Sequence, residues 1–270
     1  MFTKEIKEYD TLLHEYKIKV IELLSPNDLK KYHEILFSSH SCGIEGNSFT
    51  VDETLLLKEK GLGMIPEGKS LLESFEMIDH LNAYEFLLSN VDKPLTEDLL
   101  KETHCRLMAN TLAYKTVHDE TPAIPGEYTT YDMVAGDTVF GNHKELIKQM
   151  LRLLDSTRRM LDEGMLHPVV IAARFHGFFE YLHPFRDGNG RLGRLFSNFI
   201  LLQKKHFPLI IERKDRETYI DCLRQIKKEQ TDEYLVFFFF RISINRMKQE
   251  ITDKEKLTER FGQGDFFLSF

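Results

Sequence analysis

The chain has 270 residues, with 36 Lys and Arg against 43 Asp and Glu, so its formal net charge is −7. This balance argues against a general nucleic-acid binder, because such proteins carry a basic excess. Hydrophobic residues make up 42% and charged residues 29%, which excludes extensive disorder. The length fits one large domain, or a domain with a helical extension.

The three cysteines, Cys42, Cys105 and Cys222, lie far apart and form no CxxC pair. We therefore expect neither a disulfide framework nor a structural zinc site. The N-terminus is charged and lacks the apolar core of a signal peptide, and no apolar run approaches the length of a membrane span. These features predict a soluble, cytoplasmic protein without a membrane partner.

Helical patterns dominate the first part of the chain. Apolar spacing predicts a helix over 4–24. Ser25 and Pro26 then predict the start of a second helix, which should end near Gly43. Further helices are expected over 51–60, 68–90 and 95–110. A change in character near residue 92 leads us to treat 1–92 as an N-terminal helical region.

Residues 112–142 interrupt the helices with prolines and glycines. β-forming residues predict two short strands, over 128–134 and 137–140, around Ala135 and Gly136. Helices resume over 143–163, 167–183, 190–204 and 215–258. The sequence therefore predicts a mainly α fold: a helical bundle with a short β-hairpin flap. We divide the remainder into a core, 93–245, and a C-terminal helical tail, 246–270.

A polar, glycine-rich segment, His183-Pro-Phe-Arg-Asp-Gly-Asn-Gly-Arg-Leu-Gly-Arg194, lies between two apolar helices. Gly188 and Gly190 permit positive φ and close approach of a ligand. Asn189 between them tolerates unusual backbone angles and offers an amide. Consecutive N–H groups at a helix start form a nest that binds anions.

The other side chains of this segment suit phosphate chemistry. Arg191 and Arg194 are three residues apart and carry guanidinium groups that match phosphate oxygens. Asp187 is a hard oxygen ligand of the kind that Mg²⁺ uses together with phosphates. His183 can take up a proton near neutral pH. The combination predicts a phosphate site, while a capped turn between helices remains the alternative from chemistry alone.

This segment resembles the signature of the Fic family, HPFx(D/N)GNGRxxR, at every fixed position. Asn198, the segment Arg216-Glu-Thr-Tyr219 and Gly126-Glu-Tyr128 are also similar to Fic-domain sequence, so the resemblance covers about residues 40–245. It implies a Fic-like helical bundle that acts as a protein adenylyltransferase. Such an enzyme transfers AMP from ATP to a hydroxyl of a target protein and releases pyrophosphate.

The resemblance also implies roles for individual residues. His183 would be the catalytic base, and Asp187 would hold Mg²⁺ between the α- and β-phosphates of ATP. The nucleotide would be bound by Gly188, Asn189, Gly190, Arg191 and Arg194, with Arg194 on the γ-phosphate and Tyr219 near the base.

The flap would hold an extended segment of the target by main-chain pairing. The residues concerned are Tyr128, Thr129, Thr130 and Tyr131. Thr129 stands where the family often has arginine, which leaves the target preference open.

An upstream segment, Ser41-Cys-Gly-Ile-Glu45-Gly46-Asn47, resembles the inhibitory motif (S/T)xxxE(G/N) of Fic proteins. It implies an inhibitory helix near 27–46 with Ser41, Glu45 and Gly46 as regulatory residues. Glu45 would pair with Arg194 and displace the γ-phosphate of ATP. The alternative is that Glu45 only occupies a turn with Gly46.

We therefore predict a self-inhibited protein adenylyltransferase whose partners are ATP and a target protein. Within the same enzyme class, removal of AMP from a modified protein and transfer from another nucleotide donor remain alternatives. A nucleotide-binding interaction module without turnover is the non-enzyme alternative. Self-modification and homo-oligomerisation are left open.

Overall fold

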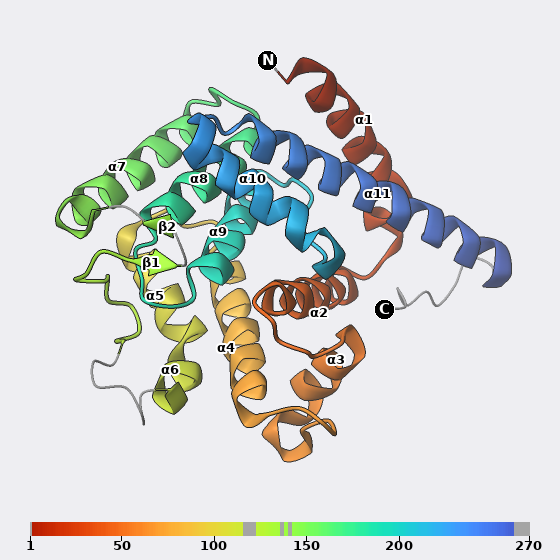
Figure 1. The fold of residues 1–270 in the computed structure, drawn as a ribbon. Coiled ribbons are helices and arrows are strands. Elements are labelled where there is room, and N and C mark those ends of the chain that lie inside the picture. Colours follow the sequence, from red (N-terminus) through yellow and green to blue (C-terminus); the bar gives the residue numbers. More distant parts are fainter. Residues whose placement is uncertain (1, 116–122, 136–137, 140–141, 262–270) are drawn as a thin grey trace.

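The computed structural model describes residues 2–115, 123–135, 138–139 and 142–261. These residues form a mainly helical molecule (Figure 1). The longer elements are α1 (Thr3–Lys19), α2 (Pro26–Ile44), α3 (Val51–Lys60), α4 (Leu71–Leu88), α5 (Glu97–Leu107), α6 (Ala109–Lys115), α7 (His143–Asp162), α8 (Pro168–Leu182), α9 (Asn189–Gln203), α10 (Arg216–Glu229) and α11 (Glu233–Phe261).

Local sequence explains where several helices begin. Thr50 and Ser70 each accept a hydrogen bond from the backbone N–H three residues on, and Glu53 and Glu73 complete the two capping boxes. One helix predicted over 215–258 is instead two, α10 and α11. The break lies at Gln230, whose backbone is left-handed with φ 52°.

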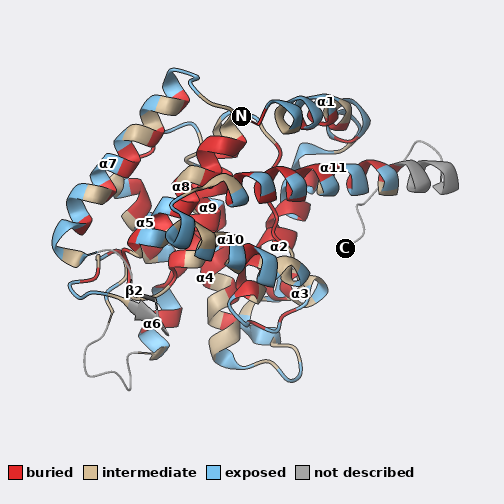
Figure 2. Ribbon diagram, turned by 45° about the horizontal axis from the view of Figure 1, so that its top comes forward, coloured by how far each residue is buried: buried red, intermediate tan, exposed pale blue. Residues whose placement is uncertain are grey.

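Helices α8 and α9 pack against each other at the centre of the molecule and are largely buried (Figure 2). One cluster of buried apolar side chains runs from Phe2 to Ile251. This cluster includes residues of all three predicted regions. The boundary expected between residues 245 and 246 lies within α11, which is continuous there. No described helix combines the length and the apolar character needed to cross a membrane.

The predicted hairpin is much reduced. Strands β1 (Val134–Ala135) and β2 (Thr138–Val139) pair antiparallel over two residues each. The strand expected over 128–134 is wrong before residue 134, because Thr129 Oγ1 accepts a hydrogen bond from Tyr131 N (3.2 Å) and so replaces ladder pairing with a local turn. Residues 136–137 and 140–141 of the prediction lie outside the described residues.

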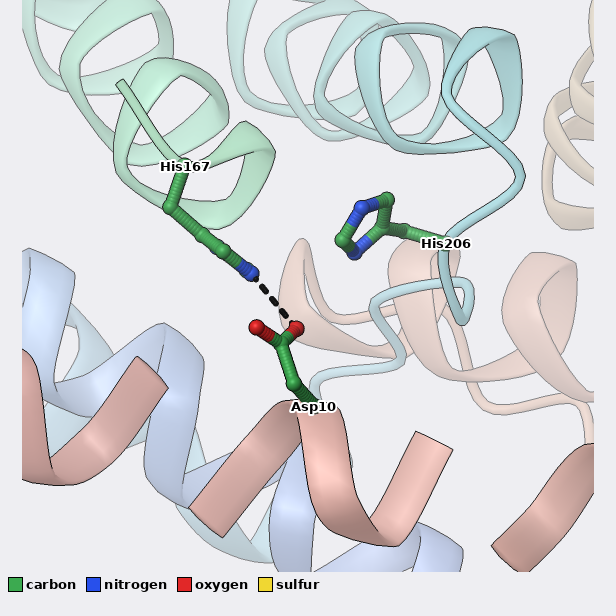
Figure 3. Close-up of side chains that lie close together, drawn as sticks. All are labelled: Asp10, His167 and His206. Carbon is green, nitrogen blue, oxygen red and sulfur yellow. Dashed lines mark hydrogen bonds and ion pairs between the residues drawn. The ribbon is translucent and has the colours of Figure 1, made fainter. Parts of the chain in front are cut away.

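Helix α1 lies along α11 and is fastened to the core by Asp10, His167 and His206 (Figure 3). His167 Nδ1 accepts a hydrogen bond from Val169 N (3.2 Å), so the ring proton is on Nε2, which donates to Asp10 at 3.0 Å. That nitrogen therefore has no lone pair for a metal ion. We interpret the group as a hydrogen-bonded contact that holds α1 in place.

Glu250 of α11 forms a second, buried link to α1 and α2. Its carboxylate accepts hydrogen bonds from Tyr16 Oη (2.7 Å) and Arg246 Nε (2.7 Å), and His33 Nε2 lies 3.5 Å away. Burial by itself would raise the pKa of Glu250, but the hydrogen bonds and charges of these three neighbours lower that pKa to about 2.

We predict that Glu250→Gln lowers the free energy of unfolding by about 3 kcal/mol at pH 7, because it removes the nearer counter-charge of the largely buried Arg246 guanidinium and leaves only Glu212, at 3.6 Å. In the unfolded chain the pKa of the Glu250 carboxyl is about 4.3. The stabilisation is therefore present above about pH 5 and is lost as the pH falls towards 2. Urea unfolding of both proteins over this pH range measures the effect.

The control is Glu8→Gln, which removes an exposed ion pair between the same two helices, Glu8 to Lys248 at 2.8 Å. It should cost much less stability than Glu250→Gln, because the pair is exposed and screened by solvent. Equal losses in the two variants would contradict the importance of the buried network.

Candidate active site

The glycine-rich loop between α8 and α9 is held rigidly at both ends. His183 caps α8 in the left-handed conformation (φ 48°), and Gly188 caps α9 with φ 80°. Between them, Phe185 is buried and its backbone N–H and C=O both bond to the side chain of Asn189, at 2.9 and 2.6 Å. These contacts hold the loop in this conformation without a ligand.

These hydrogen bonds change the role that the sequence suggested for the side chain of Asn189. The amide of Asn189 was expected to face a ligand, but it is buried and used by the loop. Asn189 contributes to the nest at the start of α9 only through its backbone N–H. Gly188 and Gly190 flank it as expected.

Arg194 of α9 is the centre of the site and only 2% exposed. Its Nη2 donates to Glu45 Oε1 (2.7 Å) and to the carbonyl of Ser41 (2.9 Å), and its Nε donates to Ser41 Oγ (3.0 Å). Residues Ser41 and Glu45, which belong to the upstream motif, thus meet Arg194 as the sequence predicted. Gly46 follows with φ 103°, a conformation that suits glycine.

The Glu45 carboxylate also lies against the nest. A Cβ atom on Gly190 would be 2.5 Å from Glu45 Oε1, so a larger residue at 190 would push this carboxylate away. Burial by itself would raise the pKa of Glu45, but the charge and hydrogen bond of Arg194 outweigh it and lower that pKa. Glu45 is therefore an anion that lies beside the start of α9, where the helix dipole favours negative charge.

His183 lies beside this nest with 22% of its side chain exposed. Burial lowers its pKa to about 4, although a hydrogen bond with the backbone carbonyl of Glu180 and the charges of Glu45 and Asp187 act in the opposite direction. The imidazole is therefore neutral at pH 7 and able to accept a proton.

Asp187 and Arg191 form an ion pair at the mouth of the site. Arg191 Nη2 is 3.1 Å from Asp187 Oδ1, and Lys115 Nζ is 2.8 Å from Asp187 Oδ2. The guanidinium of Arg191 is buried, facing Asp187 and Glu76, so the predicted phosphate contact would require it to turn. One carboxylate, part-exposed beside a nest, suits a Mg²⁺ ion that takes its other ligands from phosphate and water.

Tyr219, which was predicted to lie near the nucleobase, is a buried neighbour of Arg194. Its ring is buried, its hydroxyl lies 2.7 Å from His176 Nε2, and Arg194 Nη1 donates to that hydroxyl at 3.4 Å. The predicted position near the base stays a prediction; in this structure the side chain lies beneath Arg194 and orients its guanidinium.

The four predicted flap residues divide into two pairs. Tyr128 packs on Phe185 (ring centroids 5.1 Å apart), and Thr129 N donates to the carbonyl of Pro184 at 2.8 Å. Thr130 and Tyr131 are exposed. The first pair anchors the segment to the glycine-rich loop, and the second pair offers side chains to the solvent.

His104 of α5 connects the flap segment to the loop, and the sequence did not point to it. Its Nδ1 accepts from Gly126 N (2.8 Å), its Nε2 lies 3.0 Å from the Asp187 carbonyl, and its ring stacks on Phe185 at 3.8 Å. Burial lowers its pKa to about 4. The neutral ring therefore fixes the position of Asp187 relative to the flap segment at Gly126.

Fold and site define a helical protein in which a histidine lies beside an anion-binding nest. Comparisons with known proteins show which proteins this chain resembles. Residues 94–201 match the sequence model of the Fic/DOC family. The protein adenylyltransferase Fic of Nematostella vectensis is 32% identical over 189 residues, which cover 69% of this chain and 42% of that protein. Residues 94–201 are therefore a domain of the Fic/DOC family.

Solved structures show the same fold. A Fic domain-containing signaling protein from Bacteroides thetaiotaomicron has a TM-score of 0.77 at 26% identity, covering 92% of this chain and 97% of that one. Fic-1 from C. elegans also has a TM-score of 0.77, at 22% identity over 94% of this chain and 73% of that one. The chain spans less than half the length of the adenylyltransferases whose sequences it matches.

We predict that His104→Phe, which retains the stacked ring but loses both hydrogen bonds, lowers the free energy of unfolding by about 1–3 kcal/mol. The amide of Gly126 should exchange with deuterium faster. Because the folded pKa is depressed below the ordinary value, the wild type loses stability as the pH falls from about 6.5 to 4, and the variant lacks this contribution. His14→Phe, at an exposed position, is the control; equal exchange at Gly126 in all three proteins would contradict the role.

Proposed function

We propose that this chain is a protein adenylyltransferase that transfers AMP from ATP to a hydroxyl of a target protein and is inhibited by Glu45. The observation that carries the proposal is the Glu45 carboxylate, held 2.7 Å from Arg194 and against Gly190. An internal anion thus occupies a site built for phosphate. The Fic adenylyltransferases to which the chain is similar support the same activity.

His183 acts as the general base. Its proton lies on the nitrogen that faces the Glu180 carbonyl, and the other nitrogen accepts the proton of the target hydroxyl. The hydroxyl oxygen then forms a bond to the α-phosphorus of ATP while the bond to pyrophosphate breaks. Positioning and charge neutralisation supply most of the rate enhancement.

The nest and the charged groups around it bind the nucleotide. The backbone N–H groups of Gly188, Asn189 and Gly190 would donate hydrogen bonds to the phosphates, that of Gly188 once it leaves Asp187 Oδ1, to which it donates at 2.6 Å. Arg194 would bind the γ-phosphate once Glu45 has left. Asp187 would hold Mg²⁺, which neutralises phosphate charge when bound. Arg191 and Lys115 keep the Asp187 carboxylate ionised and oriented.

The exposed pair Thr130 and Tyr131 receives the target. The segment is fixed by the bond from Thr129 N to the Pro184 carbonyl, next to His183. An extended target chain paired with the segment 130–135 would bring its hydroxyl towards the histidine.

Replacing Glu45 tests the proposal. Glu45→Gly should incorporate AMP from labelled ATP and Mg²⁺ at least about 10-fold faster than wild type, since Arg194 becomes available to the γ-phosphate. Intact mass detects AMP on the chain itself, and a whole-cell extract supplies other acceptors. Glu45→Gly/His183→Ala should remove the incorporation.

Glu67→Gly, in an exposed loop, is the matched control and should behave as wild type. A Glu45→Gly protein that binds ATP but modifies neither acceptor would contradict the proposed activity. Incorporation equal to that of wild type would contradict inhibition by Glu45.

Asp187→Asn in the Glu45→Gly protein tests the metal role. We expect the transfer rate with MgATP to fall by about 100-fold, because the metal loses its protein ligand. Calorimetry provides a second readout: Mg²⁺ should strengthen ATP binding to the parent but not to the variant. Asp162→Asn, an exposed carboxylate at the end of α7, is the control, and unchanged metal dependence in the Asp187 variant would exclude the role.

A further inference from the structure

Glu180 is a buried carboxyl of α8 that the mechanism above does not use. It precedes His183 by one helical turn, and only 14% of its side chain is exposed. Its Oε1 has no hydrogen-bond partner among the described residues. A buried carboxyl oxygen left without a partner is costly, so a role beyond packing is expected.

The other oxygen of this carboxyl faces the base. Glu180 Oε2 lies 3.9 Å from His183 Nδ1, within reach for a direct charge interaction with the imidazole. On the opposite side, Glu180 Oε1 would be 3.2 Å from a Cβ on Gly193, so the glycine permits the carboxyl to reach this position. The backbone of α9 and the histidine therefore enclose the carboxyl between them.

We propose that Glu180 is a positioning residue whose carboxylate stabilises the positive charge that His183 acquires during AMP transfer. The inference rests on the proposed function. The target O–H bond breaks and its proton passes to His183, while the oxygen bonds to the α-phosphorus and pyrophosphate leaves. Glu180 exchanges no atom in this step and acts through its negative charge near Nδ1.

The electrostatics of the pocket explain why such a partner is needed. Burial lowers the pKa of His183 to about 4, so the protonated ring is disfavoured unless an anion lies close by. Burial also raises the pKa of Glu180 to about 8. Most Glu180 side chains are therefore neutral at pH 7 in the inhibited protein, and ionisation increases the fraction ready for transfer.

The charge of Glu180 depends on neighbours from every element around it. These are His176 and His183 of the α8 segment, Arg194 of α9, Glu45 at the end of α2, and Tyr219 of α10. Glu45 raises the pKa of Glu180, and Arg194 lowers it. Departure of Glu45 thus favours the carboxylate, so release of the inhibitory residue also prepares the base.

The test uses the full chain with Glu45→Gly as parent and adds Glu180→Gln, which has the shape of the neutral acid but cannot ionise. The initial rate of AMP incorporation into the chain and the extract is measured across about pH 6–9. In the parent, kcat should rise with pH as Glu180 ionises. In the variant this rise should be absent and the plateau at least about 10-fold lower, with KM for MgATP changed less than about 2-fold.

Two further variants distinguish loss of the Glu180 carboxylate from misfolding. Glu180→Asp retains a carboxylate farther from the ring and should recover part of the rate and the pH dependence. Tyr181→Phe, at the exposed neighbouring position of α8, should match the parent. If Glu180→Gln equals the parent in kcat at every pH, or if it changes only KM or the melting temperature, the role of Glu180 is wrong while the adenylyltransferase proposal stands. A parent that incorporates no AMP overturns both.

Discussion

The buried guanidinium of Arg194 is the constraint around which the site is arranged. A cation with 2% exposure must be compensated, because an unpaired buried charge costs several kcal/mol. The Ser41 carbonyl and hydroxyl, the Tyr219 hydroxyl and the Glu45 carboxylate all meet this requirement. A residue suited to a phosphate thus needs an anion in the resting state, and an internal carboxylate provides it. In the proposed function, structural compensation and inhibition are the same interaction.

The end of α2 must be fixed for Glu45 to reach Arg194. Arg216 Nε donates to the Ile44 carbonyl at 2.7 Å, and Asn47 Nδ2 donates to the Glu73 carbonyl at 2.9 Å. Arg213 lies directly against Gly43, where any side chain would collide with its guanidinium. The helix was expected to end near Gly43 and ends at Ile44, and the glycine permits this close approach. Contacts from α10 and α4 therefore aim a carboxylate that is itself 41% exposed.

The sequence was informative where a role depends on neighbours along the chain. The glycine-rich segment was expected between two apolar helices and lies between α8 and α9, and the helix expected over 51–60 is α3. The sequence was less informative where the direction of a side chain decides the role. Asn189 faces its own loop and Tyr219 faces Arg194, because tertiary packing selects those rotamers. His104 and Lys115 meet Asp187 only after folding. Glu180 could have been noticed as the single carboxylate of a helix that is otherwise mostly apolar.

Charge balance connects these observations with the proposed chemistry. In the resting molecule three cations, Arg191, Arg194 and Lys115, face three carboxylates, those of Asp187, Glu45 and Glu76, so the site is already close to neutral. A triphosphate that replaces Glu45 brings more negative charge than it removes. A divalent cation at Asp187 would offset this excess, and without one the added charge would oppose ionisation of Glu180. Metal binding, the departure of Glu45 and the protonation of His183 would therefore be coupled electrostatically. A change in any one of the three would change the other two.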